Sequence, residues 1–127
     1  WGWLSRHTLI HGAITELHLV EAEKTALDCE RENVTDPRAQ FHWADATDWT
    51  PPSALDGVIM NPPFSDVRKH IAAALSLMGS GGHECAPRVV ALVPLTFQHP
   101  DAEELEQLPD DTFANAKVRP KIIRIYR

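Results

Sequence analysis

The alternation of apolar and polar residues along the chain predicts a series of strands and helices. Short apolar runs that end at proline or at polar residues are typical of buried strands, whereas apolar residues that recur every three or four positions are typical of helices. On this basis we predict strands over residues 17–20, 40–43, 57–60 and 89–93. We predict helices over residues 3–10, 23–33 and 66–78. Because strands and helices alternate at this spacing, we expect an α/β fold with a mainly parallel sheet and helices on both faces.

The helix over residues 66–78 has the clearest ends. Ser65 or Asp66 can cap its first turn, because short polar side chains accept hydrogen bonds from the first free N–H groups of a helix. Gly79 is suited to ending the helix, since glycine readily adopts the left-handed conformation of a helix terminus. The apolar residues between these two ends form one stripe, so we expect this helix to pack on the sheet.

The pattern is weaker in the last third of the chain. Residues 99–112 are acidic and contain two prolines, which predicts a loop with at most a helical turn over residues 102–108. Residues 116–118 and 122–126 predict two strand pieces, or a hairpin that turns at Arg119 and Pro120.

Length and composition limit the class of protein. A chain of 127 residues, 43% of them hydrophobic, predicts one domain over residues 1–127 with a modest core. No apolar run is long enough to cross a membrane, and no basic segment followed by an apolar one opens the chain. The two cysteines form no C-x-x-C pair, so a reduced cytoplasmic setting is expected.

The net charge of −6 is unevenly distributed along the chain. The body is acidic, which argues against a protein that follows a long phosphate backbone, since such binding depends on many lysine and arginine contacts. Residues 117–127 carry basic residues and no acid, and this end can contact one or two phosphates. The interpretation we favour is that these basic residues occupy the solvent-facing positions of an alternating strand.

One stretch combines a strand end with a polar side chain. The apolar residues 58–60 are followed by Asn61, where a strand must end because Pro62 and Pro63 have no N–H to donate. An amide is thus held at the carboxyl end of a strand by a stiff turn, with the ring of Phe64 close by in sequence. Open α/β sheets bind ligands at this edge. The alternative is a rigid turn with a buried Phe64 and no chemical role.

Two acidic residues follow the preceding strands in the same way. Glu21 comes nineteen residues after Gly2, close to the spacing of about twenty between a nucleotide-binding glycine turn and the acid that binds ribose. Asp45 follows the next strand and can accept a hydrogen bond from the exocyclic amine of an adenine. Each acid alone is equally well explained as a cap for the turn after its strand.

These motifs resemble a known family. Asn61, Pro62, Pro63 and Phe64 after an apolar strand resemble the amino-methyltransferase signature of class I S-adenosylmethionine-dependent methyltransferases. Residues 19–21 and 44–46 resemble the ribose and adenine motifs of that family, and residues 1–2 resemble the end of its D-x-G-x-G-x-G loop. The resemblance implies a Rossmann-like methyltransferase fold that binds S-adenosyl-L-methionine. It implies these cofactor-binding residues: Gly2, Glu21, Ala22, Asp45, Ala46 and Asn61.

The resemblance narrows the substrate to a few classes. Residues 1–64 resemble small-subunit rRNA guanine-N2 methyltransferases, whereas residues 93–97, 112–118 and 122–125 resemble N6-adenine DNA methyltransferases. We therefore expect a nucleic-acid base as the substrate, in rRNA or in DNA, with a slight preference for rRNA. A protein glutamine amide is a further alternative. A second hypothesis, which is not enzymatic, is that the chain is a catalytically inactive methyltransferase-like fragment or binding module.

The chemistry of such a reaction fits the four residues of the motif. An exocyclic amine is a poor nucleophile because its lone pair is delocalised into the ring. The side-chain oxygen of Asn61 and the carbonyl of Pro62 can each accept one N–H of the amine, which returns electron density to the nitrogen and orients it. The ring of Phe64 can stack on an unpaired or flipped-out base.

The chain departs from the family pattern at its start. The central first strand and the first glycines of the cofactor loop precede the position of Trp1 in that family, and the chain is interpreted as truncated there. We predict that residues 1–127 alone bind S-adenosylmethionine weakly or not at all. Isothermal titration would test this prediction, and micromolar binding would contradict it.

The remaining candidate residues are given structural interpretations. His7 and His11 are spaced four apart on a predicted helix, but no third ligand is near, so no metal site is predicted. His18 and His42 show no ligand spacing. Trp43 is interpreted as a core or loop packing residue.

Overall fold

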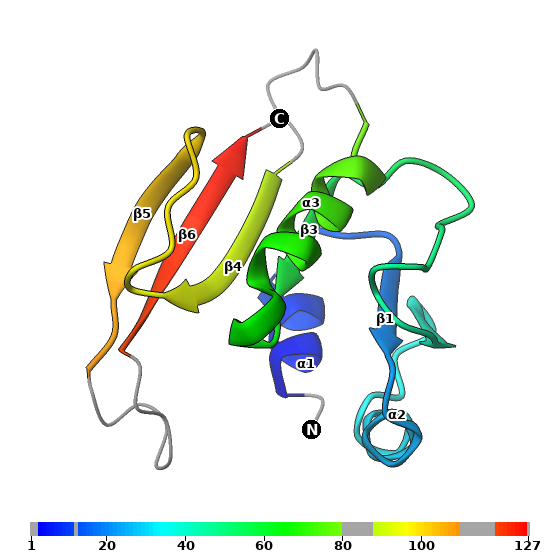
Figure 1. Ribbon diagram of the computed structural model, residues 1–127. Helices are drawn as coiled ribbons and strands as arrows, with labels where there is room; N and C mark the ends of the chain where they lie inside the picture. The colour runs from blue at the N-terminus through cyan, green and yellow to red at the C-terminus, as the bar shows by residue number, and fades with distance from the viewer. Residues whose placement is uncertain (1–2, 12, 80–87, 110–118, 127) are drawn as a thin grey trace. The chain divides into compact units, whose positions relative to one another are not determined.

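A computed structural model describes residues 3–11, 13–79, 88–109 and 119–126. The chain divides into two compact units, Trp1–Trp49 and Thr50–Arg127, and most of their helices and strands are labelled in Figure 1. Each unit combines helices with a parallel pair of strands, so the predicted α/β class is confirmed. The expected strand piece over residues 116–118 lies outside the described residues.

The first unit is a two-stranded parallel sheet with two helices. Its elements are α1 (Trp3–His11), β1 (Leu17–Glu21), α2 (Lys24–Asn33) and β2 (Ala39–Trp43). Leu17 pairs with Ala39 at one end of the sheet and Glu21 pairs with Trp43 at the other. These elements confirm the predicted order of helix and strand, with boundaries that differ by one residue or so.

One face of this small sheet holds the core of the first unit. Side chains alternate between the two faces of a strand, so Leu17 and Leu19 share a face with Ala39 and Phe41. Leu19 is buried on this face together with Leu9 of α1 and Val34, which follows α2. The opposite face carries the polar side chains of His18 and His42.

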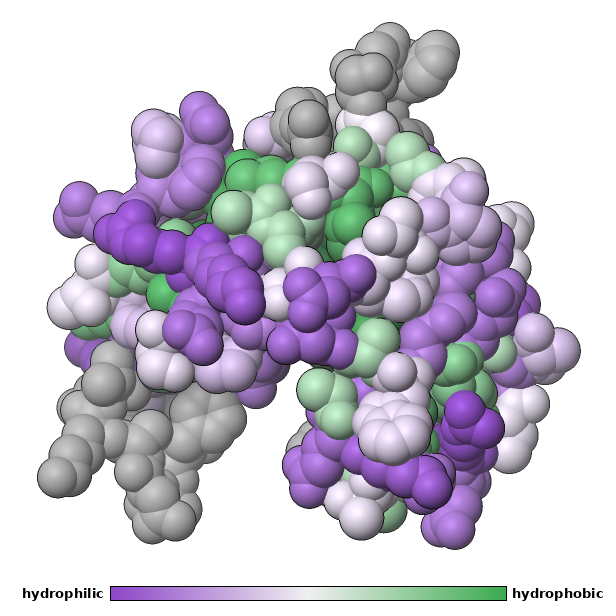
Figure 2. Space-filling model, turned by 45° about the vertical axis from the view of Figure 1, so that its right-hand side comes forward, coloured by the Kyte–Doolittle hydropathy of each residue, from purple (hydrophilic) through white to green (hydrophobic). Residues whose placement is uncertain are grey.

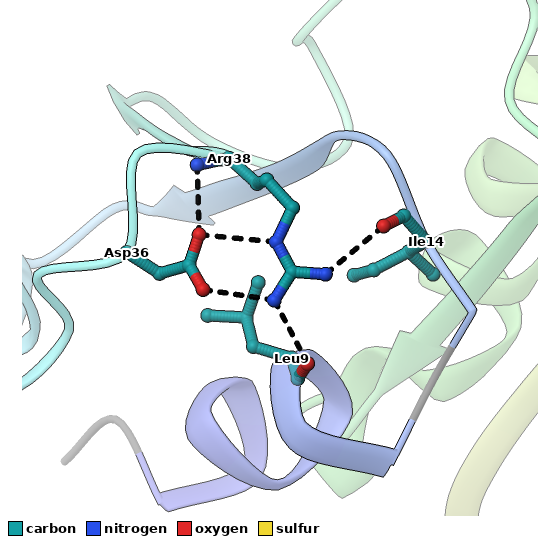
Figure 3. Close-up of polar contacts among 4 residues, drawn as sticks. All are labelled: Leu9, Ile14, Asp36 and Arg38. Carbon is teal, nitrogen blue, oxygen red and sulfur yellow. Dashed lines mark hydrogen bonds and ion pairs between the residues drawn. The ribbon is translucent and has the colours of Figure 1, made fainter.

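A single arginine connects three segments of the first unit (Figure 3). The guanidinium of Arg38 donates to both carboxylate oxygens of Asp36, at 3.1 and 2.8 Å. The same group donates to the carbonyl oxygens of Leu9 and Ile14, at 2.9 and 3.0 Å. The last carbonyls of a helix have no partner within the helix, so Arg38 satisfies one at the end of α1. Arg38 therefore fixes the loop between α1 and β1 against the turn before β2.

Replacing Arg38 with methionine is expected to lower the stability of the first unit. The hydrogen bonds from Arg38 hold the pKa of Asp36 down at about 2, from an ordinary value of 3.8. This stabilisation is present above pH 3.8 and is lost as the pH falls towards 2, because only the ionised carboxylate is favoured by the arginine. Urea unfolding should show a lower midpoint for Arg38→Met at neutral pH and a smaller loss on acidification. Arg6→Met, at an exposed position on α1, is the control and should leave both unchanged.

The second unit is built on a four-stranded sheet. Its elements are β3 (Gly57–Met60), a 3₁₀ turn η1 (Phe64–Asp66), α3 (Val67–Leu77), β4 (Arg88–Pro94), β5 (Ala102–Gln107) and β6 (Pro120–Tyr126). The strand order is β3-β4-β6-β5, in which β3 and β4 are parallel and β6 is antiparallel to both of its neighbours. The pairing is thus mixed, and the described strands of the chain form two separate sheets.

The core of the second unit lies between α3 and its sheet. Val67, Ile71 and Ala74 are the buried residues of the helix, and they confirm the predicted apolar stripe. They pack against alternate residues of β4 and β6, which point to the same face of the sheet. These sheet residues are Val89, Ala91, Val93, Ile123 and Ile125.

Both ends of α3 differ from the sequence prediction. Asp66 occupies the N-cap position, but its side chain makes no capping hydrogen bond, because the chain enters the helix through η1. The helix ends at Leu77, and Met78 is extended, so Gly79 is not the left-handed cap that we predicted. The carbonyl of Leu77 is satisfied instead by the N–H of Leu55, at 2.9 Å.

The prediction of a loop or helical turn over residues 102–108 was wrong. Residues 102–107 form β5, which pairs antiparallel with β6, and Pro120 is the first residue of β6 rather than part of a hairpin turn. Cross-strand ion pairs accompany the backbone pairing, since Glu103 contacts Arg124 at 2.6 Å and Glu104 contacts Lys121 at 3.3 Å. The partners come from far along the chain, so local composition did not indicate the strand.

The described surface is mixed in character. In Figure 2 hydrophilic residues cover much of the face shown, with hydrophobic residues exposed between them. The large apolar residues with the highest exposure include Ile10 at 74%, Trp43 at 64% and Ile59 at 52%. Trp43 and Ile59 lie on β2 and β3, at or near the strand ends where the site is predicted. None of the described helices has the length and apolar character needed to cross a membrane.

Candidate functional site

The ends of β1 and β2 bring four of the predicted cofactor residues together. Glu21 and Trp43 pair across the two strands, and the N–H of Ala44 donates to the carbonyl of Glu21 at 3.1 Å. Glu21 and Ala22 therefore lie beside Asp45 and Ala46 at the carboxyl edge of this sheet. Gly2 lies outside the described residues.

Glu21 has a local partner that leaves room for a ligand. Its Oε1 accepts a hydrogen bond from the N–H of Glu23 at 3.0 Å, as expected of an acid that caps the turn after a strand. A carboxylate has about four acceptor positions, so this bond is compatible with a further bond to a ribose hydroxyl. Burial, and then the negative charge of Glu21, raise the pKa of Glu30 on α2. This edge is therefore suited to groups that donate hydrogen bonds.

Asp45 caps the turn that follows β2. Its Oδ1 accepts hydrogen bonds from the N–H and the hydroxyl of Thr47, at 2.8 and 2.7 Å. Its carbonyl accepts the N–H groups of Asp48 and Trp49, both at 3.0 Å. The side chain is exposed, but contact with an adenine amine stays a prediction.

Trp43 was interpreted as a core or loop packing residue, and the structure contradicts the core alternative. Its side chain is 64% exposed, and its indole N–H donates to the carbonyl of Ala22 at 3.0 Å. The ammonium of Lys24 lies 5.7 Å from the centre of the ring. Trp43 thus stands directly beside the predicted ribose acid. Its position as the last residue of a strand was the signal that could have identified it.

The predicted catalytic residues follow β3 in the second unit. Asn61 is exposed, Pro62 is buried, and Phe64 is half-buried at the start of η1. The carbonyl of Pro63 accepts a hydrogen bond from the N–H of Asp66 at 3.0 Å, and this bond fixes the residues that follow the two prolines. The amide of Asn61 is thus presented to solvent by a backbone that two prolines and a 3₁₀ turn make stiff. A preorganised acceptor of this kind can orient an amine.

The polar face of the first sheet contains a small histidine cluster. Nδ1 of His18 lies 2.9 Å from Nε2 of His42, and Nε2 of His18 lies 2.8 Å from a carboxylate oxygen of Glu16. The ring of Trp49 contacts both imidazoles, with centroid distances of 5.4 and 4.9 Å. Within the described ranges, no three or more His, Cys, Asp or Glu side chains are placed to hold a metal ion.

The His42 environment predicts a pH dependence of stability. Burial, and then the neighbouring His18, lower the pKa of His42 from its ordinary value of 6.5. As the pH falls below about 6.5, the unfolded chain takes up a proton that the folded sheet resists, so stability is lost in this range. Urea midpoints measured at about pH 8 and about pH 5 should differ less in His42→Gln than in the unmodified chain. His70→Gln, on α3, is the control, and an equal pH dependence in all three proteins would contradict the prediction.

Comparison with known proteins gives a family and a fold. The family model of the methyltransferase small domain matches residues 1–84, about two thirds of the chain. Among solved structures, the 23S rRNA methyltransferase ErmE is similar with a TM-score of 0.79 and 16% identity, over 99% of this chain and 57% of that protein. The chain thus spans little more than half the length of ErmE. No curated protein matches the sequence.

Two further structures support the same fold. The N-methyltransferase NodS from Bradyrhizobium japonicum is similar with a TM-score of 0.68 and 10% identity, over 99% of this chain and 80% of that one. An rRNA methylase from Streptococcus thermophilus is similar with a TM-score of 0.60 and 9% identity, over 88% and 73%. At identities this low the likeness shows the fold alone.

Proposed function

Because the chain belongs to the methyltransferase small domain family, we propose that it transfers a methyl group from S-adenosylmethionine to an exocyclic amine of a nucleic-acid base. The observation that carries this proposal is the exposed Asn61, held at the carboxyl end of β3 by the turn through Pro62 and Pro63. An amide oxygen beside a backbone carbonyl gives two acceptors for the two N–H bonds of an amine. No strong base is needed, because the amine loses its proton after the new bond has formed.

The proposed cofactor residues have the hydrogen-bonding character that the cofactor requires. Glu21 can accept from the ribose hydroxyls and Asp45 from the adenine amine, and both are carboxylates at the same sheet edge. When bound, S-adenosylmethionine supplies an electrophilic methyl group on a sulfonium. The chain's part is to bind the nucleoside end at this edge and to orient the target amine at Asn61. Phe64 stacks on the target base.

The substrate we propose is rRNA, with DNA as the alternative. The similarity of residues 1–64 to guanine-N2 methyltransferases favours rRNA, and the names of two structural neighbours agree with it. The whole chain has a net charge of −6 even though residues 117–127 are basic, and this acidic character favours a substrate held by few phosphate contacts. DNA adenine N6 and a protein glutamine amide remain alternatives on the basis of the Asn-Pro-Pro-Phe motif. A cytoplasmic location and a single domain over residues 1–127 stay predictions.

A specific observation favours a second candidate, an inactive methyltransferase-like module. The described strands form a two-stranded and a four-stranded sheet, and no described strand joins them. Glu21 and Asp45 follow strands of the two-stranded sheet, whereas Asn61 and the catalytic turn follow a strand of the four-stranded sheet. A module of this kind would bind a nucleic acid without transferring a methyl group.

Transfer of a tritiated methyl group would separate these possibilities. The assay is run with residues 1–127 and with a longer variant that carries a D-x-G-x-G-x-G loop before Trp1, and rRNA, DNA and a release-factor-like protein are offered to both in parallel. Label in rRNA or in DNA supports the proposal and chooses between the two nucleic acids. If only the protein is labelled, the substrate is a protein and not a nucleic acid. If none of the three is labelled, the inactive module is favoured.

A further inference from the structure

The second unit contains a polar cavity that the proposed catalytic residues do not use. Its volume is about 260 Å³, and it is lined by the loop after β4 and by residues of β5 and β6. Phe97, Ala102 and Ile123 supply apolar walls. Glu104 and Lys121 supply a carboxylate and an ammonium. Figure 1 shows β4, β6 and β5 side by side in this part of the molecule.

The cavity lies at the same edge of the sheet as the catalytic turn, but two to three strands away. Met60 pairs with Ala91, Ala91 with Ile123, and Ile123 with Glu104, so these four residues form one row across the sheet. Asn61 is the next residue along β3. Since neighbouring strands are about 4.8 Å apart, the cavity begins about 10 Å from β3 and extends to about 14 Å. It is therefore separate from the place proposed for the target base.

Lys121 does not have the position that we interpreted for it from the sequence. We expected a solvent-facing residue, but Lys121 is only 9% exposed and pairs with Val93 on the face that holds the core. Its Nζ lies 3.3 Å from Oε2 of Glu104, longer than the usual 2.7–2.9 Å of a charged hydrogen bond. The two groups are in direct contact, so a ligand can bind beside this pair but not between its groups.

Glu104 has hydrogen-bond acceptor positions that its described partners do not use. Its Oε1 accepts from the side-chain amide of Gln107 at 2.7 Å. The hydrogen bond from Gln107, and then that from Lys121, lower the pKa of Glu104, so the carboxylate stays ionised and cannot donate. A carboxylate has about four acceptor positions, of which Gln107 and Lys121 use two on Glu104. An ammonium has three N–H donors, of which Lys121 uses one for Glu104. The cavity therefore offers acceptors beside a donor.

We propose that this cavity binds an unpaired guanine base of the nucleic-acid substrate, near the target base. The proposal rests on the proposed function, and it identifies Glu104 and Lys121 as specificity-determining residues. Guanine alone among the standard bases presents two adjacent donors, N1–H and the N2 amine, beside an acceptor, O6. The two donors suit the carboxylate of Glu104, and O6 suits the ammonium of Lys121. Phe97 and Ile123, which are 6% and 1% exposed, close the cavity on its core side.

Other ligands fit this arrangement less well. A phosphate is repelled by the ionised Glu104. Adenine and cytosine present only one donor to a carboxylate on this edge, and uracil presents its single donor between two acceptors. Reading an unpaired base through hydrogen bonds to its Watson–Crick edge is the usual route to specificity in single-stranded nucleic acids.

Binding of labelled oligonucleotides tests the proposal independently of methyl transfer. Fluorescence anisotropy is measured with short uridine-rich RNA strands that carry one guanine, inosine or 7-deazaguanine, and with the DNA equivalents. Inosine lacks the N2 amine, whereas 7-deazaguanine keeps the whole Watson–Crick edge. The guanine and 7-deazaguanine strands should bind about tenfold more tightly than the inosine strand. Glu104→Gln should abolish this preference, and Glu106→Gln, at an exposed position on the same strand, should keep it.

Each outcome supports or overturns the proposal. Equal binding of guanine and inosine, a preference that survives Glu104→Gln, or no binding of any strand would overturn it. Competition by free guanosine monophosphate as strong as by the guanine strand would also overturn it, since the cavity would then take a free nucleotide. Methyl transfer without a guanine preference would leave the proposed function standing. A guanine preference without methyl transfer would support the guanine site and count against the proposed function.

Discussion

Replacing Asn61 by alanine is expected to lower the rate of methyl transfer by about 10²- to 10³-fold, the usual cost of removing one preorganised polar group from an active site. Alanine removes the side-chain oxygen that accepts an N–H of the target amine and leaves only the carbonyl of Pro62. Because Asn61 is exposed and lies outside the core of its unit, the fold should be retained. The rate is measured with tritiated S-adenosylmethionine and saturating substrate, in a longer variant that carries a D-x-G-x-G-x-G loop before Trp1, because residues 1–127 alone are predicted to bind the cofactor weakly.

The control for this variant is Ser65→Ala. Ser65 is an exposed residue of the same 3₁₀ turn, one position after Phe64, and has no role in the proposed reaction. Its replacement should leave the rate unchanged. Circular dichroism of both variants should match that of the unmodified protein. Activity that survives in Asn61→Ala would rule out the proposed role of the amide.

Replacing Ile71 by alanine is expected to lower the free energy of unfolding of the second unit by about 2–5 kcal/mol. The side chain is 1% exposed, in the middle of α3, within the cluster that includes Val89 and Ile123. Removing three of its carbon atoms leaves a cavity that a close-packed helix–sheet interface fills only in part. Urea unfolding followed by circular dichroism gives the value.

Ser76→Ala is the matched control on the same helix. Ser76 is exposed, and its hydroxyl donates to the carbonyl of Ala73 within α3. A surface replacement of this kind changes stability by about 0.5 kcal/mol or less. An equal effect of the two substitutions on the free energy of unfolding would mean that the packing of Ile71 does not stabilise the unit.

The sequence was sufficient for the elements that depend on neighbours along the chain, although it did not predict how α3 begins and ends. The apolar period predicted α3 and β4, and Pro62 and Pro63 predicted the end of β3, because these effects act within a few residues. The same local patterns predicted a polar residue at the carboxyl end of each of the first three strands. The positions of Glu21 and Asp45 at one sheet edge follow from the parallel pairing of β1 and β2.

The sequence was insufficient wherever structure depends on distant partners. Residues 102–107 are acidic and have little apolar period, and they form a strand only because β6 supplies hydrogen bonds and opposite charges. Lys121 was interpreted as exposed for the same reason, since Glu104 and the cavity around it were not foreseeable. The cavity thus arises from two segments whose pairing local patterns did not indicate.

The acidic composition of β5 has a consequence for the protein in solution. Among the described strands β5 is the last of its sheet, so its outer edge can recruit a strand from another molecule. Glu103, Glu104 and Glu106 place negative charge along that strand, and a bulge between Glu104 and Glu106 interrupts its regular backbone. Charge and irregularity both oppose edge-to-edge association. The same glutamates that kept this strand from being foreseen therefore protect the molecule against aggregation.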